Sequence, residues 1–301
     1  MKIASFLWKD DPWYGLVEGD SLRPVEEAFK TRFPSLRSVL AAGSVAALAE
    51  HCRNQPALGI DTVTFLPPVP DPERTTCVGI NYPKRYPLDA NVGRPEHIIL
   101  FAKLPGTILG HGASLEIPAG EAAATFDYEG EIAVIIGRPG RHIPADRAHE
   151  HIAGYTAFND GSVRGWQKHS VHAGKNFAGS GACGPWMVTA DEIGAPEAMT
   201  VTTRLNGQIV QHAPATEMFF SITKVIAYVS HLAPIAPGDV IAMGSPEGSG
   251  GSRVPPRFLM NGDMLEIEVS GVGTLANRIG TGNAGTATDK YAYSGPSGCS
   301  F

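Results

Sequence analysis

The sequence lacks a hydrophobic run long enough to cross a membrane. Nowhere in its 301 residues do apolar residues approach the roughly 20 in succession that a membrane-spanning helix needs. The segment Met1–Asp11 has Lys9, Asp10 and Asp11 where a signal peptide needs its apolar region. We therefore expect a cytoplasmic protein with no membrane partner.

Cysteine and positive charge are both scarce. The four cysteines are scattered and form no CxxC pair, which argues against a disulfide framework or a zinc knuckle. Lys and Arg number 24 against 30 Asp and Glu, giving a formal net charge of −6. Because there is no long basic run, we expect no nucleic-acid partner. A small anionic substrate would have to be held by a local positive pocket. The cysteines are Cys52, Cys77, Cys183 and Cys299.

Apolar residues make up 43% of the chain and charged residues 18%, so a packed core is expected and global disorder is not. Residues 1–70 predict a small N-terminal α+β domain. Two apolar runs, 2–7 and 14–17, flank a turn and predict a hairpin. The segment Ser35–Cys52 has helical spacing. Four prolines between Phe65 and Pro72 then predict a stiff linker.

Beyond Thr75, short runs rich in Val and Ile alternate with glycine-rich and proline-rich turns, which is typical of β structure. The clearest helical pattern lies at Phe219–His231. We predict a larger domain over residues 71–283 and a tail over 284–301 that need not be ordered. The fold class is therefore mixed α/β and mostly β. The clearest predicted strands are 98–101, 132–136, 201–205, 240–243 and 264–269.

A row of alternating carboxylates precedes one of these strands. In the segment 127–137 (DYEGEIAVIIG), Asp127, Glu129 and Glu131 would point to the same face of an extended chain. Beside a buried run these charges would repel one another and resist desolvation, and a divalent cation removes that conflict. Mg²⁺, Mn²⁺ and Ca²⁺ prefer such oxygen ligands. The alternative is an edge strand whose acidic side chains face solvent.

A further carboxylate follows the segment 154–160 (GYTAFND). Asp160 ends an apolar run, which is a usual place for a ligand or a catalytic group, although a plain turn aspartate is the alternative. Arg164, Gln167 and Lys175 follow in a polar stretch. Cations close to a carboxylate site suit an anionic substrate.

Several segments in this order resemble the fumarylacetoacetate hydrolase family. Each is weakly specific alone, but the ordered set covers roughly residues 75 to 280. The segments are 77–82 (CVGINY), 128–137 (YEGEIAVIIG), 154–160 (GYTAFND), 174–175 (GK), 184–188 (GPWMV), 205–208 (LNGQ), 237–248 (PGDVIAMGSPEG) and 258–263 (FLMNGD).

The resemblance implies a rolled β-sheet catalytic domain with a metal at its mouth. It implies that Glu129, Glu131 and Asp160 bind Mg²⁺ or Mn²⁺. It also implies that Lys175 lies beside the metal, that the substrate contacts a further set of side chains, and that the protein is a homodimer. The implied substrate contacts are Tyr82, Gln167 and Ser245, the last standing where the family usually has Thr.

The sequence departs from the family at one place. Many relatives have a His and, three residues later, a Glu that together activate water, and here Arg85 and Leu88 stand at those positions. Arg85 could instead clamp a substrate carboxylate. We expect Arg85, Lys175 and Glu247 to be the catalytic residues. If water is activated, Glu247 is our candidate for the base. The other candidate bases are Asp89, His111, His169 and His172.

These observations predict a metal-dependent hydrolase that cleaves a carbon–carbon bond in a small 1,3-dicarbonyl acid such as an acylpyruvate, through an enolate that the metal stabilises. The missing His/Glu pair keeps a second hypothesis open, in which the same site isomerises, tautomerises, decarboxylates or hydrates a 2-oxo acid. A third is a binding protein that has lost catalysis.

Overall fold

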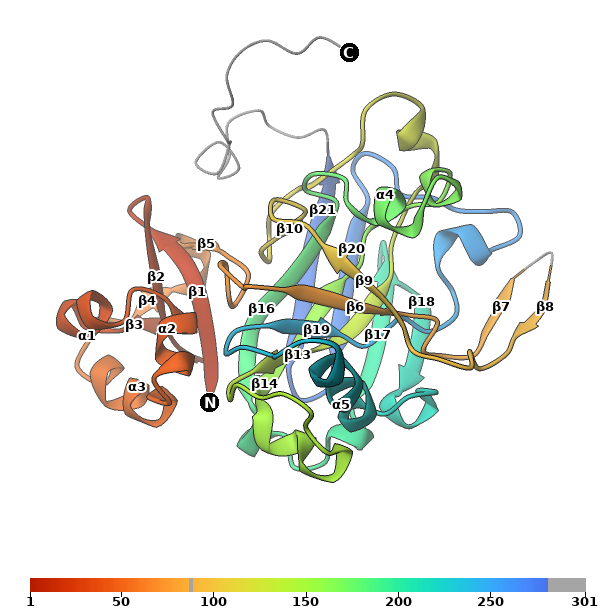
Figure 1. Cartoon of the computed structure of the whole chain (residues 1–301). Helices are drawn as coiled ribbons and strands as arrows, with labels where there is room; N and C mark the ends of the chain where they lie inside the picture. The colour runs from red at the N-terminus through yellow and green to blue at the C-terminus, as the bar shows by residue number, and fades with distance from the viewer. Residues whose placement is uncertain (87–88, 281–301) are drawn as a thin grey trace, which may run out of the picture.

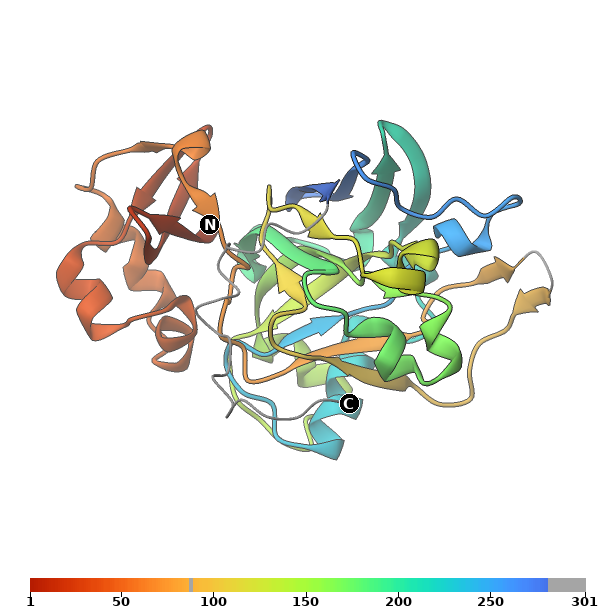
Figure 2. The same ribbon diagram turned by 90° about the horizontal axis from the view of Figure 1, so that it is seen from above.

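The structure is a computed structural model that describes residues 1–86 and 89–280, without the side chains of residues 84–92. The N-terminal elements form a lobe at one side of the molecule (Figures 1 and 2). They are β1 (Lys2–Trp8), β2 (Asp11–Glu18), β3 (Ser21–Pro24), α1 (Glu27–Arg32), α2 (Leu36–Ala41), α3 (Val45–Cys52), β4 (Leu58–Gly59), the 3₁₀ turn η1 (Ile60–Thr62) and β5 (Thr64–Phe65).

The predicted hairpin is confirmed, because β1 and β2 pair antiparallel from Ile3↔Leu16 to Trp8↔Asp11. The prediction of one helix over 35–52 is wrong. Ser35 and Ser38 form a capping box that starts α2, and the chain then reverses at Gly43, whose φ of 62° lies in the left-handed region that favours glycine. Two short helices, α2 and α3, result.

The rest of the described chain is mostly β. Its first half contains β6 (Thr75–Gly79), β7 (Lys84–Tyr86), β8 (Asp89–Val92), β9 (Ile99–Lys103), β10 (Ile108–Leu109), β11 (Leu115–Glu116), η2 (Gly120–Thr125), β12 (Phe126–Asp127), β13 (Gly130–Ile136), η3 (Ala145–His151), β14 (Ile152–Asn159), β15 (Ser162–Val163), η4 (Trp166–Lys168), α4 (Val171–Lys175) and β16 (Gly181–Thr189). Its second half contains η5 (Ala190–Glu192), η6 (Pro196–Ala198), β17 (Thr200–Leu205), β18 (Gln208–Pro214), η7 (Ala215–Glu217), α5 (Ile222–Leu232), β19 (Val240–Ala242), η8 (Gly250–Ser252), β20 (Met264–Val269) and β21 (Gly273–Gly280).

One large sheet joins the two parts of the molecule. Its strand order is β4-β3-β2-β1-β16-β14-β13-β19-β6-β9. The junction is the antiparallel pair β1–β16, with Lys2 opposite Val188 and Ile3 opposite Met187. The N-terminal strands thus extend the central sheet directly. The division at residue 70 and the homodimer stay predictions, and the tail over 284–301 lies outside the described residues.

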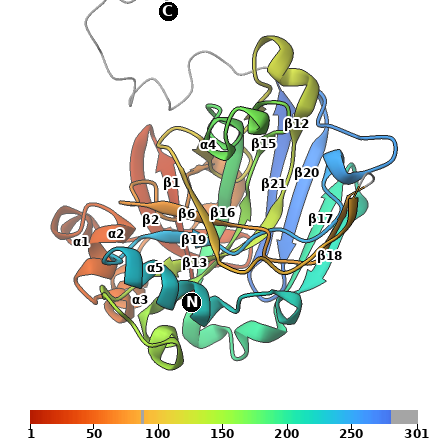
Figure 3. The same ribbon diagram turned by 45° about the vertical axis from the view of Figure 1, so that its right-hand side comes forward.

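A second sheet, in the order β11-β21-β20-β17-β18, packs against the large one, and Figure 3 shows its long strands standing together beside β16. The main hydrophobic core lies between the two sheets and includes Ile132, Val134, Val201 and Ile267. At Gly130 a Cβ atom would come within 2.0 Å of Thr203 Oγ1, so a glycine at the start of β13 permits this close approach.

The fold class is as predicted: mixed α/β and mostly β. The predicted helix at 219–231 corresponds to α5. No described helix is long and apolar enough to cross a membrane. Cys52, Cys77 and Cys183 are buried free thiols.

Candidate metal centre

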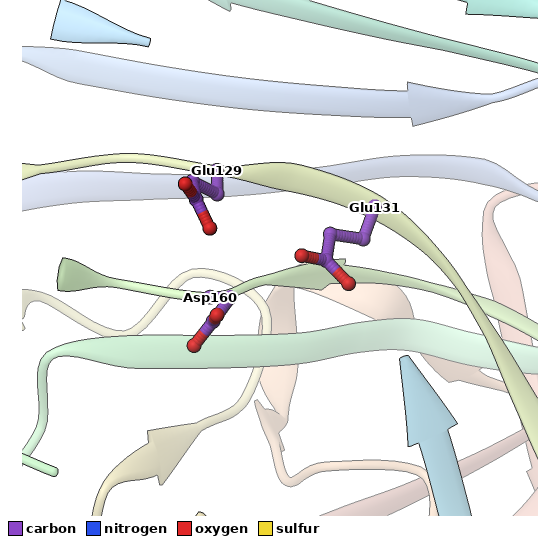
Figure 4. A group of neighbouring side chains, drawn as sticks. All are labelled: Glu129, Glu131 and Asp160. Atoms are coloured by element: carbon purple, nitrogen blue, oxygen red, sulfur yellow. The ribbon is translucent and has the colours of Figure 1, made fainter. Parts of the chain in front are cut away.

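Three buried carboxylates meet where β13 begins and β14 ends. Because these strands run antiparallel, with Glu131 opposite Phe158, the start of one lies beside the end of the other. The amide of Asp160 also donates to the Glu129 carbonyl oxygen over 2.9 Å. One carboxylate oxygen from each of Glu129, Glu131 and Asp160 lies within 4.8 Å of the others. Figure 4 shows the three side chains gathered together, and we call this set the triad.

Lys175, the last residue of α4, bridges two members of the triad. Its Nζ donates to Glu129 Oε2 over 2.6 Å and to Asp160 Oδ2 over 2.5 Å. Burial lowers the pKa of this ammonium, but the carboxylates of Asp160 and Glu129 outweigh burial and raise it above its usual range. Lys175 therefore stays protonated at neutral pH and acts as a donor rather than a base.

A second buried lysine, Lys103 at the end of β9, was not found from the sequence. Its Nζ lies 3.1 Å from Asp160 Oδ1, donates to the Gly161 carbonyl oxygen over 3.3 Å, and makes a short hydrogen bond to the Lys175 carbonyl oxygen. Its side chain has no exposed surface. A lone Lys at the end of a short strand gives no sequence signal, because only the tertiary structure brings the end of β9 close to Asp160.

Arg164 joins the triad to Asp127. It binds Glu129 Oε1 over 2.9 Å and Asp127 Oδ2 over 2.7 Å. The expectation that Asp127, Glu129 and Glu131 lie on one continuous strand is wrong, because β12 ends at residue 127 and β13 begins at residue 130. Its carboxylate instead accepts hydrogen bonds from the amides of Gly250 and Gly251. Asp127 therefore supports the loop at η8.

Glu131 is the member of the triad that most needs a cation. Burial raises its pKa well above the usual range, and Asp160 and Glu129 raise it further. Its Oε2 accepts a hydrogen bond from the Gly244 amide over 2.7 Å. In the described part of the chain no ion pair to Glu131 is present, whereas the other two members each bind two cations.

The residues present fit a hard divalent cation. Four buried carboxylates here face three cationic side chains: Asp127, Glu129, Glu131 and Asp160 against Lys103, Arg164 and Lys175. The excess is negative when Glu131 is ionised, and carboxylate oxygens are the ligands that Mg²⁺ and Mn²⁺ prefer. The triad could hold such an ion.

The hydroxyl of Tyr82 is buried beside the triad and has no hydrogen-bond partner among the described residues. Its pKa is raised by burial, then by the charges of Glu131 and Glu217, so it keeps its proton at neutral pH. The neighbouring residue, Asn81, holds this segment after β6 in place. Its side-chain amide donates to the carbonyl oxygens of Phe220 and Met243 and accepts a hydrogen bond from the Phe220 amide. Thr156 and Thr203 also have buried hydroxyls without a partner among the described residues, but the influence of Glu131 on the Tyr82 pKa places the Tyr82 hydroxyl near the triad, where it is suited to a ligand oxygen.

The remaining predicted site residues are not all placed together. Gln167 accepts a hydrogen bond from Arg164 over 3.4 Å, and Ser245 is buried directly after Gly244, whose amide binds Glu131. Glu247 is exposed and lines a separate surface cavity with Arg253 and Arg257. Arg85 lies in β7, in the hairpin that projects from one end of the molecule (Figure 1). Its side chain lies outside the description, as do those of Leu88 and Asp89.

The three candidate histidines are engaged elsewhere. His169 is exposed and packs against Trp166, and His172 is exposed and contacts the Asn176 side chain. His111 accepts a hydrogen bond from the Ala276 amide, and burial lowers its pKa. None of these contacts involves the triad.

The fold and site define a class of rolled-sheet proteins with a buried carboxylate triad. The family model described as "Fumarylacetoacetate (FAA) hydrolase C-terminal" matches residues 74–280, and the chain belongs to this family. It is a family of enzymes, and the names of the relatives include hydrolases and tautomerases.

Three relatives illustrate the range of activities for which members are named. The chain is 37% identical over 217 residues to oxaloacetate tautomerase YisK of Bacillus subtilis, covering 71% of this chain and 72% of the relative. It is 36% identical over 228 residues to the human mitochondrial oxaloacetate tautomerase FAHD2A, covering 74% and 72%. The solved structure of the fumarylacetoacetate hydrolase of Exiguobacterium antarcticum superposes with a TM-score of 0.80 at 31% identity. The match covers 94% of this chain and 100% of that chain.

Proposed function

We propose that the protein is a metal-dependent tautomerase that interconverts the enol and keto forms of oxaloacetate or a closely related 2-oxo dicarboxylic acid. The observation that supports this best is the buried, unpartnered hydroxyl of Tyr82 beside the triad. It is a protonated group available to a substrate oxygen where the enol forms and collapses. Two of the relatives described above are named for this reaction.

Ketonisation makes simple demands on a protein. The O–H bond of the enol breaks and a C–H bond forms at the neighbouring carbon, with no oxidant, no added water and no change in mass. A divalent cation, when bound at Glu129, Glu131 and Asp160, supplies Lewis-acid stabilisation of the developing oxyanion. What remains for the protein is to hold a dianion, donate a hydrogen bond to the oxygen as its own proton leaves, and allow a proton to reach the neighbouring carbon.

The side chains in the site suit these tasks. Lys175 remains an ammonium because Asp160 and Glu129 raise its pKa, so we assign it to orienting the carboxylates and attracting the anion. Tyr82 keeps its proton, so we assign it the hydrogen bond to the reacting oxygen. Gln167, Ser245 and Arg85 are proposed to contact the rest of the substrate.

Hydrolysis of a carbon–carbon bond would also need a base to activate water. The sequence has Arg85 and Leu88 in place of the usual pair, and the candidate histidines have the other contacts described above. Glu247 is exposed. These placements favour a reaction in which no water is added.

The test is the rate at which enol-oxaloacetate is converted to the keto form, followed by the loss of enol absorbance and checked by mass spectrometry. We expect catalysis with Mg²⁺ or Mn²⁺, loss with EDTA, and loss in Asp160→Asn. Asp146→Asn changes an exposed carboxylate and serves as the matched control. Full activity of Asp160→Asn in EDTA, or no acceleration with either metal, would contradict the proposal.

A second candidate function is hydrolysis of an acylpyruvate, favoured by the TM-score of 0.80 to the Exiguobacterium antarcticum hydrolase. Incubating acylpyruvates with the metal-loaded protein distinguishes the two reactions. Two fragments with a mass gain equal to water would support hydrolysis, and Glu247→Gln and Arg85→Gln would then identify the groups involved. An unchanged total mass supports tautomerisation, while loss of CO₂ from oxaloacetate would indicate a decarboxylase instead.

A further inference from the structure

A cavity of about 290 Å³ lies in the loop that connects β13 to η3. Its lining includes three arginines, two histidines and one acidic residue: Arg138, Arg141, Arg147, His142, His151 and Glu150. In Figure 1 this loop lies at the base of the molecule, beside α5. A concentration of guanidinium groups is notable in a chain whose formal net charge is −6.

The single carboxylate of the lining is shared by two arginines. Arg147 binds Glu150 through two hydrogen bonds, of 3.0 and 2.9 Å, and Arg138 Nη1 lies 3.6 Å from Glu150 Oε2. Asp146 is the other acidic group near Arg147 but does not line the cavity. Within the described residues Arg141 has no carboxylate partner, so its guanidinium donors remain available.

The backbone of this loop is fixed rather than loosely held. Gly140 forms an antiparallel bridge with Ile235, with hydrogen bonds of 3.2 and 2.8 Å. The amides of His142 and Ile143 donate to the carbonyl and hydroxyl oxygens of Ser230. Ile143 is buried in the main core. A loop anchored at these points presents its arginines without a large ordering cost on binding.

The size and chemistry of the cavity limit its ligand. Ligand pockets for drug-sized molecules occupy about 300–1,000 Å³, so 290 Å³ suits a compact molecule and not a dinucleotide. The planar guanidinium matches two oxygens of a phosphate or carboxylate group at once. Several such groups around one cavity favour an anion with more than one negative charge.

We propose that this cavity is a second binding site, for a small multivalent oxyanion such as a phosphorylated or polycarboxylate metabolite. It lies at the far end of β13 from the triad. From Glu131 to Ile136 the strand advances about 17 Å at 3.3 Å per residue, and Arg138 lies beyond that end. The ligand is therefore distinct from the substrate of the triad, and the proposal does not depend on the reaction proposed above.

The test is isothermal titration calorimetry of the full chain with pyrophosphate and, separately, with citrate. The protein is first freed of metal with EDTA and then dialysed into EDTA-free buffer, so that neither probe binds through a cation at the triad and no chelator competes for the cavity. We expect binding by at least one probe, weakened at least tenfold in Arg141→Gln and unchanged in Arg53→Gln, an exposed arginine of the N-terminal lobe. A preference for pyrophosphate indicates a phosphorylated ligand, and a preference for citrate indicates a polycarboxylate.

Because Arg141 is exposed, its substitution should leave the melting temperature unchanged, and a thermal scan verifies this. The proposal is overturned if neither probe binds, if Arg141→Gln binds as tightly as the unaltered protein, or if Arg53→Gln weakens binding equally.

Discussion

Lys103 and Lys175 bind different oxygens of the same carboxylate. Lys103 Nζ lies 3.1 Å from Asp160 Oδ1, and Lys175 Nζ lies 2.5 Å from Asp160 Oδ2. Asp160 is fully buried, and a cation contacts each of its carboxylate oxygens, as a buried carboxylate requires. The orientation of this predicted metal ligand is thus set by two lysines from separate parts of the chain.

Lys103→Met should destabilise the protein. Removing one partner of a buried ion pair leaves an uncompensated charge, which costs about 3–5 kcal/mol. The free energy of unfolding from urea denaturation measures the effect. Lys224→Met, at an exposed position, is the control and should stay within about 0.5 kcal/mol of the unaltered protein. Equal stability of the two variants would show that Lys103 does not hold Asp160.

Glu131→Gln should separate metal binding from folding. The pKa of Glu131 is raised, so the neutral amide resembles the carboxyl form that burial favours, and the metal-free variant should fold at least as stably. Its affinity for Mn²⁺ should fall at least tenfold, because a charged ligand is lost. Calorimetric titration with Mn²⁺ measures this. Unchanged affinity would exclude Glu131 as a ligand.

Stability of the metal-free protein should decrease as the pH rises above about 5. Glu131 has an ordinary pKa of 4.5, and the folded state raises it. Between those two values the folded state binds more protons than the unfolded state, so the free energy of unfolding falls with rising pH. Melting curves in EDTA between about pH 5 and pH 8 should show this fall. The fall should be smaller in Glu131→Gln, and identical slopes would count against the assignment.

Tyr82→Phe should reduce turnover without reducing stability. Its hydroxyl has no hydrogen-bond partner in the part of the chain that the structure describes, so its removal should break no bond there and relieve a desolvation cost. We expect enol-oxaloacetate turnover to fall roughly tenfold or more, since a donor to the reacting oxygen is lost. Tyr14→Phe is the converse control. It removes a 2.6 Å hydrogen bond to the Phe33 carbonyl oxygen, which should cost about 1 kcal/mol and leave turnover unchanged.

Much of the fold follows from local patterns. Alternation and apolar runs located β13, β17, β19 and β20 within a residue or two, and amphipathic spacing located α5. The break between α2 and α3 was missed because helical spacing continues through Gly43. A single left-handed glycine decided the outcome there.

The sequence located the carboxylates of the candidate site, and the resemblance to the family implied which three of them, Glu129, Glu131 and Asp160, bind a metal. Glu129, Glu131 and Asp160 stand at the ends of strongly apolar strands, where buried charges need a partner, and the structure brings them within 4.8 Å. The tertiary structure alone decided which groups partner them. It directs Asp127 to the amide of Gly250, 123 positions away in sequence. It also brings Lys103 to Asp160 across the sheet. Periodicity reports only which face of an element is buried, whereas the pairing of distant charges depends on how whole sheets pack.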